Sequence, residues 1–235
     1  MSTPTLIAVM SFVAVQTLAF PVFVFWLLRR IGTRPRVAEG TNRLSWAVRP
    51  LVAFNMVGTA LYAVAMVLAV CWLHHGADLP QELLPALTPV GALSAVAGAL
   101  FLLVLVDALN WAFHRLCHEN DWLYQRMHYV HHEYVVPDGL RAFFYVHPVE
   151  MLISSAIFIT PIVLVPWSVY TIYLYGSASI VLGAIGHAGV RLPGRFGDLF
   201  SPDVHARHHS DYRCNYAEHF TWVDRLLGTY LPPLR

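Results

Sequence analysis

Long uncharged stretches alternate with short polar segments along this chain, and the pattern predicts helices that cross a membrane. A helix needs about 20 apolar residues to span a hydrocarbon core about 30 Å thick. Runs close to that length lie at 5–28, 51–73, 90–106, 149–165 and 166–186, and the third continues as helix through Trp111 to His118. The last two runs are short and are interrupted by Pro161 and Pro166. They are compatible with two spans or with one re-entrant hairpin.

The pattern predicts an all-α integral membrane protein, a bundle of four or five transmembrane helices with a cytoplasmic histidine-rich helical cap. We expect a single domain over 1–235, in which 1–106 forms mainly the first three transmembrane helices. Residues 107–235 would form the histidine-rich catalytic region, including the hairpin 149–186. The first run lacks a basic segment before it and a small-residue cleavage site, so we expect it to be retained rather than removed as a signal peptide.

Composition narrows the class further. Hydrophobic residues make up 57% and charged residues 12% of the chain, with a mean hydropathy of +0.54, which excludes a soluble or disordered protein. The net charge of +1 argues against a nucleic-acid partner, because such binding relies on massed Lys and Arg. The cysteines Cys71, Cys117 and Cys214 are isolated and predict neither a disulfide framework nor a zinc finger.

The arginines predict the orientation in the membrane. The chain has no lysine, and its arginines lie within 29–49, 115–141 and 191–235. The segment between the second and third runs has only two charged residues, Asp78 and Glu82, and both are acidic. Cytoplasmic loops collect positive charge. Five spans with the N-terminus outside would place every arginine in the cytoplasm. Abundant arginine without lysine hints at a GC-rich bacterial genome, and hence at the plasma membrane.

Histidine is the most unusual feature of the composition. Eleven of the 13 histidines lie between His114 and His219. Nine of these eleven form an HxxxH box, two HxxHH boxes and one residue at the end of the fifth run. The histidines of each box share a helix face, because residues three and four apart lie on one side of a helix. The helix of the last box should begin at Ser201–Pro202–Asp203. The nine candidate metal ligands are His114, His118, His128, His131, His132, His187, His205, His208 and His209.

Neutral imidazole binds iron, zinc, copper and nickel, and two ions sharing nine ligands would receive four or five each. Without metal, such a cluster would repel when protonated and would leave polar nitrogens unsatisfied at the edge of the bilayer. The HExxH signature of zinc hydrolases is absent, and a single catalytic zinc usually takes only three protein ligands. A nitrogen-rich site for two metals facing lipid suits O2 chemistry on an unactivated C–H bond.

Polar residues beside the ligands are candidates for catalytic roles. Asp107 and Asn110 precede His114 by seven and four residues and share its helix face, and an imidazole N–H donated to Asp107 would fix the ring. Asn215 is a similar but weaker candidate, as are Asp203, Asp211 and Glu150. His147 precedes a proline and is compatible with a tenth ligand or with a group beside the ligands.

The ordered motifs resemble the fatty acid hydroxylase/sterol desaturase superfamily of membrane di-iron oxygenases, and most of all its sterol-oxidising branch, the C4-methylsterol monooxygenases and cholesterol 25-hydroxylase. The segments that carry the resemblance are HRLCH at 114–118, HYVHHE at 128–133, YVHPVE at 145–150, HAG at 187–189, HARHH at 205–209 and NYAEHFTWVDRLLGT at 215–229. They cover about half of the chain, from Asp107 to Tyr230. The N-terminal part does not match, and Val223 stands where relatives often carry an aromatic residue.

This resemblance implies a lipid or sterol-like substrate that is hydroxylated or desaturated with O2 and two electrons. It implies two iron ions, which zinc can replace in purified material, and a separate electron donor of the ferredoxin or cytochrome b5 type. His147-Pro148 is followed by Val-Glu, not by the Gly-Gly of a cytochrome b5 haem motif, so we expect no fused haem domain. The main alternative is a metal-binding membrane transporter or storage protein without redox catalysis. A di-haem carrier is a weaker alternative, because its paired histidines would lie within the spans.

Overall fold

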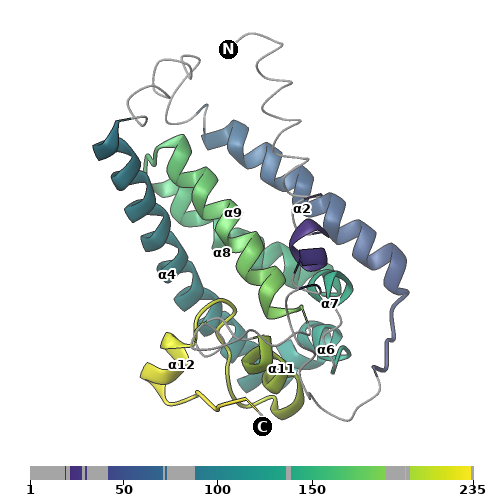
Figure 1. Cartoon of the computed structure of the whole chain (residues 1–235). Coiled ribbons are helices and arrows are strands. Elements are labelled where there is room, and N and C mark those ends of the chain that lie inside the picture. The colour runs from purple at the N-terminus through teal and green to yellow at the C-terminus, as the bar shows by residue number, and fades with distance from the viewer. Residues whose placement is uncertain are drawn as a thin grey trace.

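The computed structural model describes residues 42–70, 88–135, 139–188 and 202–233, together with 19, 22–27, 30, 72 and 199. In this part of the chain all regular secondary structure is helical, which confirms the predicted all-α class (Figure 1). The first predicted span, 5–28, falls largely outside the described residues, although 22–27 are helical.

Among the described residues, the apolar helices of the bundle are α2 (Val48–Val70), α4 (Pro89–Glu119), α8 (Pro148–Leu164) and α9 (Val169–Gly186). They correspond to the second to fifth apolar runs of the sequence. Helices α2, α4 and α9 are each long and apolar enough to cross a membrane, whereas α8, with 17 residues, is shorter. The predicted hairpin 149–186 is therefore a pair of helices, α8 and α9, joined by the short link 165–168.

The ends of these helices follow from local side-chain chemistry. The hydroxyl of Thr88 accepts the backbone N–H of Gly91 before Pro89 opens α4, and the hydroxyl of Ser168 accepts that of Thr171 at the start of α9, both at 3.1 Å. Such caps satisfy N–H groups that have no partner within the helix, and proline tolerates the first turn because it has no N–H to lose. The caps fix where α4 and α9 begin.

The core of the bundle lies where α4 packs against α8 and α9. Its buried residues are Ala99, Leu102, Leu103, Val106, Ile162 and Tyr175. Gly98 allows α9 to approach closely, because a Cβ at this position would lie 2.9 Å from Cγ2 of Thr171. Large apolar side chains such as Leu100 and Phe101 are exposed, as expected for a helix that faces lipid.

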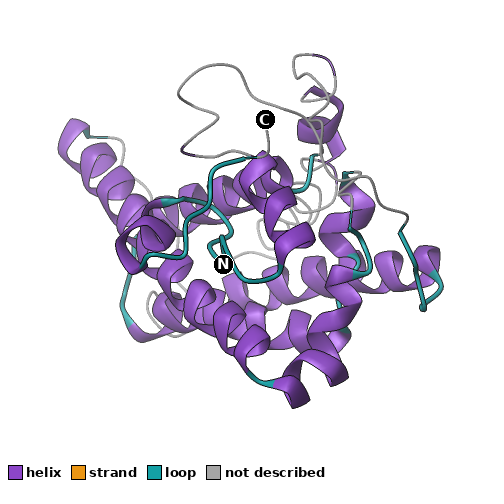
Figure 2. Ribbon diagram, turned by 90° about the horizontal axis from the view of Figure 1, so that it is seen from below, coloured by secondary structure: helices purple, strands orange, loops and turns teal. Residues whose placement is uncertain are grey.

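The shorter helices gather at the end of the bundle where α4 and α9 finish and α8 begins (Figure 1). They are α5 (Asp121–Leu123), the π-helical turn η3 (Tyr124–His128), α6 (Tyr129–His132), α7 (Leu140–Phe144), α11 (Pro202–Asp211) and α12 (Trp222–Leu227). Figure 2, seen from below, looks onto this end. These helices are the predicted histidine-rich cap. Helix α11 begins at Pro202, as expected, while the candidate cap Ser201 lies outside the described residues.

Candidate metal centre

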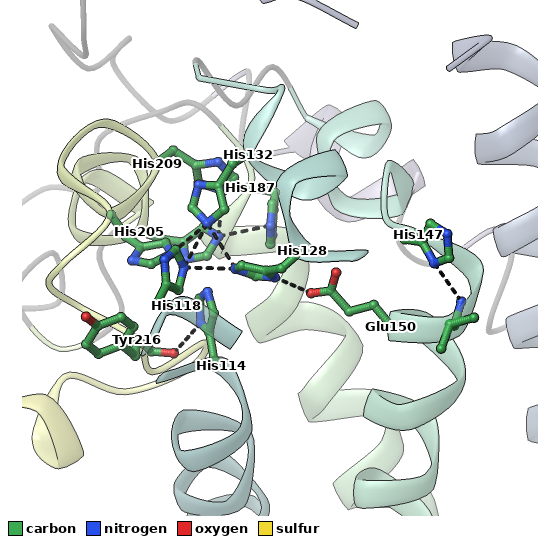
Figure 3. Close-up of polar contacts among 12 residues, drawn as sticks. His114, His118, His128, His132, His147, Glu150, His187, His205, His209 and Tyr216 are labelled. Atoms are coloured by element: carbon green, nitrogen blue, oxygen red, sulfur yellow. Dashed lines mark hydrogen bonds and ion pairs between the residues drawn. The ribbon is translucent and has the colours of Figure 1, made fainter. Parts of the chain in front are cut away.

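Segments that are distant in the sequence bring all nine candidate histidines to one place. The C-terminal end of α4 supplies two, η3 and α6 supply three, the residue that caps α9 supplies one, and α11 supplies three. Eight of the nine are buried, and the exception, His118, is partly buried. Figure 3 labels seven of them and shows that their side chains point toward one another: His114, His118, His128, His132, His187, His205 and His209. The sequence prediction that the histidine boxes converge is therefore confirmed in space.

The cluster divides into two groups. Within each group, the ligand atoms all lie within 4.8 Å of one another. The first histidine group consists of His114, His118, His128, His132 and His208, and the second of His131, His187, His205 and His209. In the first group the Nε2 atoms of His118, His128 and His132 are 2.9–3.0 Å apart, and Nε2 of His208 is 3.2 Å from that of His132. In the second group, Nε2 of His205 lies 3.1 Å from those of His187 and His209.

Each HxxHH box contributes to both groups. In the first box, His128 and His132, four residues apart, enter the first group, while His131 enters the second. In the second box the division is reversed, because only His208 enters the first group. Adjacent residues of a helix, such as those at i+3 and i+4, point in directions about 100° apart. The two neighbouring histidines of one box therefore point to different metal sites.

The outer nitrogens of several rings are fixed by hydrogen bonds. Nδ1 of His114 lies 2.7 Å from the carbonyl oxygen of Tyr216, Nδ1 of His208 2.6 Å from that of Cys214, and Nδ1 of His187 3.0 Å from that of Gly183. A carbonyl oxygen can only accept, so each Nδ1 carries the proton and each Nε2 presents a lone pair to the group. This is the tautomer that a metal ion requires.

The donor set fits metal ions by two further observations. Nε2 of His114 is buried and has no hydrogen-bond partner among the described residues, although its lone pair faces the first group. The closest nitrogens are about 3.0 Å apart, which matches neighbouring ligands at right angles around one ion with bonds of about 2.1 Å. Lone pairs this close would repel without a cation between them, so the cluster has the chemistry of a metal site.

Electrostatics favours the neutral, metal-binding form of the imidazoles. Burial, reinforced by the neighbouring imidazoles, lowers the pKa of His131, His132, His205, His208 and His209 well below the usual value. Burial likewise lowers the pKa of His187 to about 4. These rings are therefore uncharged at neutral pH, and no second ring proton has to leave before a metal binds.

One carboxylate contacts a candidate ligand directly. Oε1 of Glu150, in the first turn of α8, lies 2.6 Å from Nδ1 of His128 (Figure 3). Both side chains are buried, and the other oxygen of Glu150 has no partner among the described residues. A carboxylate that accepts the outer N–H of a ligating histidine fixes the ring and raises its basicity. The sequence placed Glu150 only among the weaker candidates.

Two of the three predicted catalytic residues, Asp107 and Asn215, bond to backbone groups rather than to the histidine rings. The carboxylate of Asp107 accepts the backbone N–H groups of His219 and Phe220, at 2.9 and 3.2 Å, so the imidazole contact expected for it is wrong. Seven residues of helix rise about 10 Å, too far for Asp107 to reach the ring of His114. The amide of Asn215 bonds to backbone groups of Leu231 near the C-terminus and to the carbonyl of Val204 in α11.

Asn110 is buried on the face of α4 that carries His114, and its Oδ1 has no partner among the described residues. A catalytic role for Asn110, as for Asp107 and Asn215, stays a prediction.

His147 belongs to neither histidine group. Its Nδ1 accepts the backbone N–H of Val149 at 3.2 Å and caps the start of α8, away from the cluster (Figure 3). Sequence reasoning gave no role to Glu218, which lines a small cavity with His205 and His219. Burial, reinforced by the Glu150 carboxylate, raises the pKa of Glu218 to about 7. In the sequence, only the position of Glu218 within the NYAEHF segment indicated a possible role, because the groups around it come from other helices.

Comparison with known proteins agrees with this arrangement. The family model described as fatty acid hydroxylase matches residues 99–229, which hold all nine histidines. Methylsterol monooxygenase 1 of Gallus gallus is 35% identical over 54% of this chain and 43% of its own length. A very-long-chain aldehyde decarbonylase of Oryza sativa subsp. indica is 34% identical over 57% of this chain and 52% of its own length.

Cholesterol 25-hydroxylase of Mus musculus is 30% identical over 67% of this chain and 53% of its own length. The chain thus spans about half the length of the curated relatives it matches. No solved structure gives a significant match. Because the family match covers more than half of the chain and contains the whole histidine cluster, the protein belongs to the fatty acid hydroxylase family.

Proposed function

We propose that this protein is a membrane di-iron oxygenase that hydroxylates or desaturates a lipid or sterol-like substrate. The observation that carries the proposal is the pair of histidine groups, in which nine imidazole nitrogens converge at the end of an apolar helix bundle. Five and four nitrogen ligands are compatible with one iron ion in each group. The similarity to a methylsterol monooxygenase and a cholesterol 25-hydroxylase supports the choice of substrate class.

The overall hydroxylation would convert R–H, O2, two electrons and two protons into R–OH and water. Iron, when bound, supplies the redox chemistry that activates O2; zinc can replace it in purified material but lacks this chemistry. The carbonyl oxygens of Tyr216 and Cys214 hold the rings of His114 and His208, and Glu150 holds that of His128. The substrate would enter from the bilayer between the apolar helices, whose outer faces carry exposed leucine and phenylalanine side chains.

The electrons would come from a separate carrier of the ferredoxin or cytochrome b5 type. We infer that it docks in the cytoplasm, because described arginines such as Arg49, Arg115 and Arg207 lie at the same end of the bundle as the histidine cluster. Together with the bacterial origin inferred from the arginine bias, this orientation favours the plasma membrane as the location of the protein.

The test combines metal analysis with isotope labelling. Protein purified without oxygen should hold about two iron ions per chain and, with a reductant and a one-electron carrier, should transfer labelled oxygen from O2 to a membrane lipid or desaturate it. His131→Ala and His208→Ala should each lower metal content and abolish turnover while the protein stays in the membrane. Bound metal without any O2-dependent change in lipid would overturn the oxygenase and support the storage or transport alternative. Protein without transition metal would overturn both.

A further inference from the structure

The segment 214–231, named here the C-terminal clamp, folds back along α4 and contacts three successive turns of one helix face. Asp107 accepts the N–H groups of His219 and Phe220, and Nε1–H of Trp111 donates to Asp224 at 2.9 Å. One turn further, Nδ1–H of His114 donates to the carbonyl of Tyr216. Because positions 107, 111 and 114 share one face, the clamp is fastened along the helix that carries the first histidine box.

Asp224 is the centre of the clamp. Its Oδ1 accepts Nε1–H of Trp111 and the backbone N–H of Tyr216, both at 2.9 Å, and the hydroxyl of Thr229 at 2.7 Å. Its Oδ2 accepts the backbone N–H of Ala217 at 3.0 Å. The side chain is buried, and the four donors supply both carboxylate oxygens with hydrogen-bond partners.

Asn215 holds the other edge of the clamp. Its backbone lies in the left-handed region, with φ of 54°, which asparagine tolerates better than most residues. Its amide accepts the N–H of Leu231 at 2.9 Å and donates to the carbonyls of Leu231 and Val204. Together Asp224 and Asn215 fix the backbone on both sides of Asn215, including the carbonyls of Cys214 and Tyr216.

These two carbonyls both serve the first histidine group. That of Tyr216 accepts Nδ1–H of His114, and that of Cys214 accepts Nδ1–H of His208. Among the described hydrogen bonds of rings in the second group, none goes to the clamp, and His187 uses a carbonyl of its own helix. Through these hydrogen bonds the clamp therefore orients rings of the first histidine group and, among the described contacts, no ring of the second.

We propose that Asp224 is a positioning residue for the first metal site alone, through the carbonyls that fix the tautomer and direction of His114 and His208. The proposal rests on the proposed function only in that the two histidine groups bind metal. In Asp224→Asn an NH2 group would face the N–H of Ala217, which could no longer donate to it. The carbonyl of Tyr216 belongs to the same peptide unit as this N–H and would be free to turn away. Partners that orient ligands in this way change metal affinity by about 10- to 100-fold.

The test measures Fe²⁺ affinity by anaerobic titration in two backgrounds that each retain one site. His131→Ala with His205→Ala leaves the first site, and His118→Ala with His128→Ala leaves the second. Asp224→Asn should weaken binding about 10- to 100-fold in the first background and leave it unchanged in the second. Asp121→Asn is the matched control, because this carboxylate is exposed at the start of α5 and lies outside the clamp. It should change neither affinity.

Thr229→Val provides a milder variant where Asp224→Asn fails to accumulate. It removes one donor to Asp224 and should shift the affinity of the first site in the same direction by a smaller factor. Equal loss from both sites, or no loss from the first, would overturn the positioning role. Failure of the unsubstituted chain to bind two ions would instead overturn the proposed function, so the two failures are distinguishable.

Discussion

Replacement of Glu150 by glutamine tests whether the carboxylate tunes the first metal site. The Oε1–Nδ1 distance to His128 is 2.6 Å and both side chains are buried, so this charged hydrogen bond is poorly screened by water. Glutamine has nearly the same shape and can still accept the N–H, but it removes the negative charge that makes the imidazole more basic. Partners of ligating histidines are worth about 10- to 100-fold in metal affinity, or about 1.4–2.7 kcal/mol.

A 10- to 100-fold loss of metal affinity would distinguish Glu150→Gln from the ordinary loss of a surface charge. Asp121→Asn is the control, because Asp121 is exposed at the start of α5, and surface charges contribute only about 0–1 kcal/mol. The assay is anaerobic Fe²⁺ titration of purified protein, with thermal unfolding measured alongside. Glu150→Gln should weaken one of two binding steps, while Asp121→Asn changes neither. An affinity within twofold of the unsubstituted protein would refute the view that His128 is tuned by its carboxylate.

Two further substitutions test assignments made from the structure. The pKa of Glu218 is raised from the usual 4.5 to about 7. Between these two pH values the folded state binds more protons than the unfolded state, so the stability of the protein falls as the pH rises from 4.5 to 7. Glu218→Gln should remove this part of the fall in melting temperature between pH 4.5 and 7, and an unchanged pH dependence would show that Glu218 is not buried. His147→Ala should lower stability by about 1 kcal/mol through the lost cap of α8 while metal content stays the same. Loss of a metal ion would restore His147 as a ligand.

The sequence predicted the elements whose cause is local. Apolar runs placed four helices within a few residues of their observed ends, because length and hydropathy set a membrane helix. The i, i+3 and i+4 spacing put the histidines of each box on one side of a helix, and the structure brings all three boxes together with His187. Both predictions depended on residues that are close in the chain.

Contacts that orient the ligands could not be predicted in this way. The partners of His114 and His208 are backbone carbonyls, which every residue possesses, so the identity of Tyr216 or Cys214 carries no signal. The prediction for Asp107 identified the correct helix face but not the loop that reaches it from 112 residues away. Only the folded arrangement shows that backbone N–H groups of this loop, rather than an imidazole, donate to the carboxylate of Asp107.

The division of each HxxHH box explains why this spacing suits a centre with two metals. A helix that carried only HxxxH would direct both rings to one ion, as His114 and His118 do. Inserting a third histidine at the i+3 position turns one ring by about 100°, so the same helix also reaches the neighbouring site. Because η3–α6 and α11 divide their rings in opposite senses, each ion would be held by both helices. The two sites are therefore fixed relative to each other by rigid elements, as joint action on one O2 molecule would require.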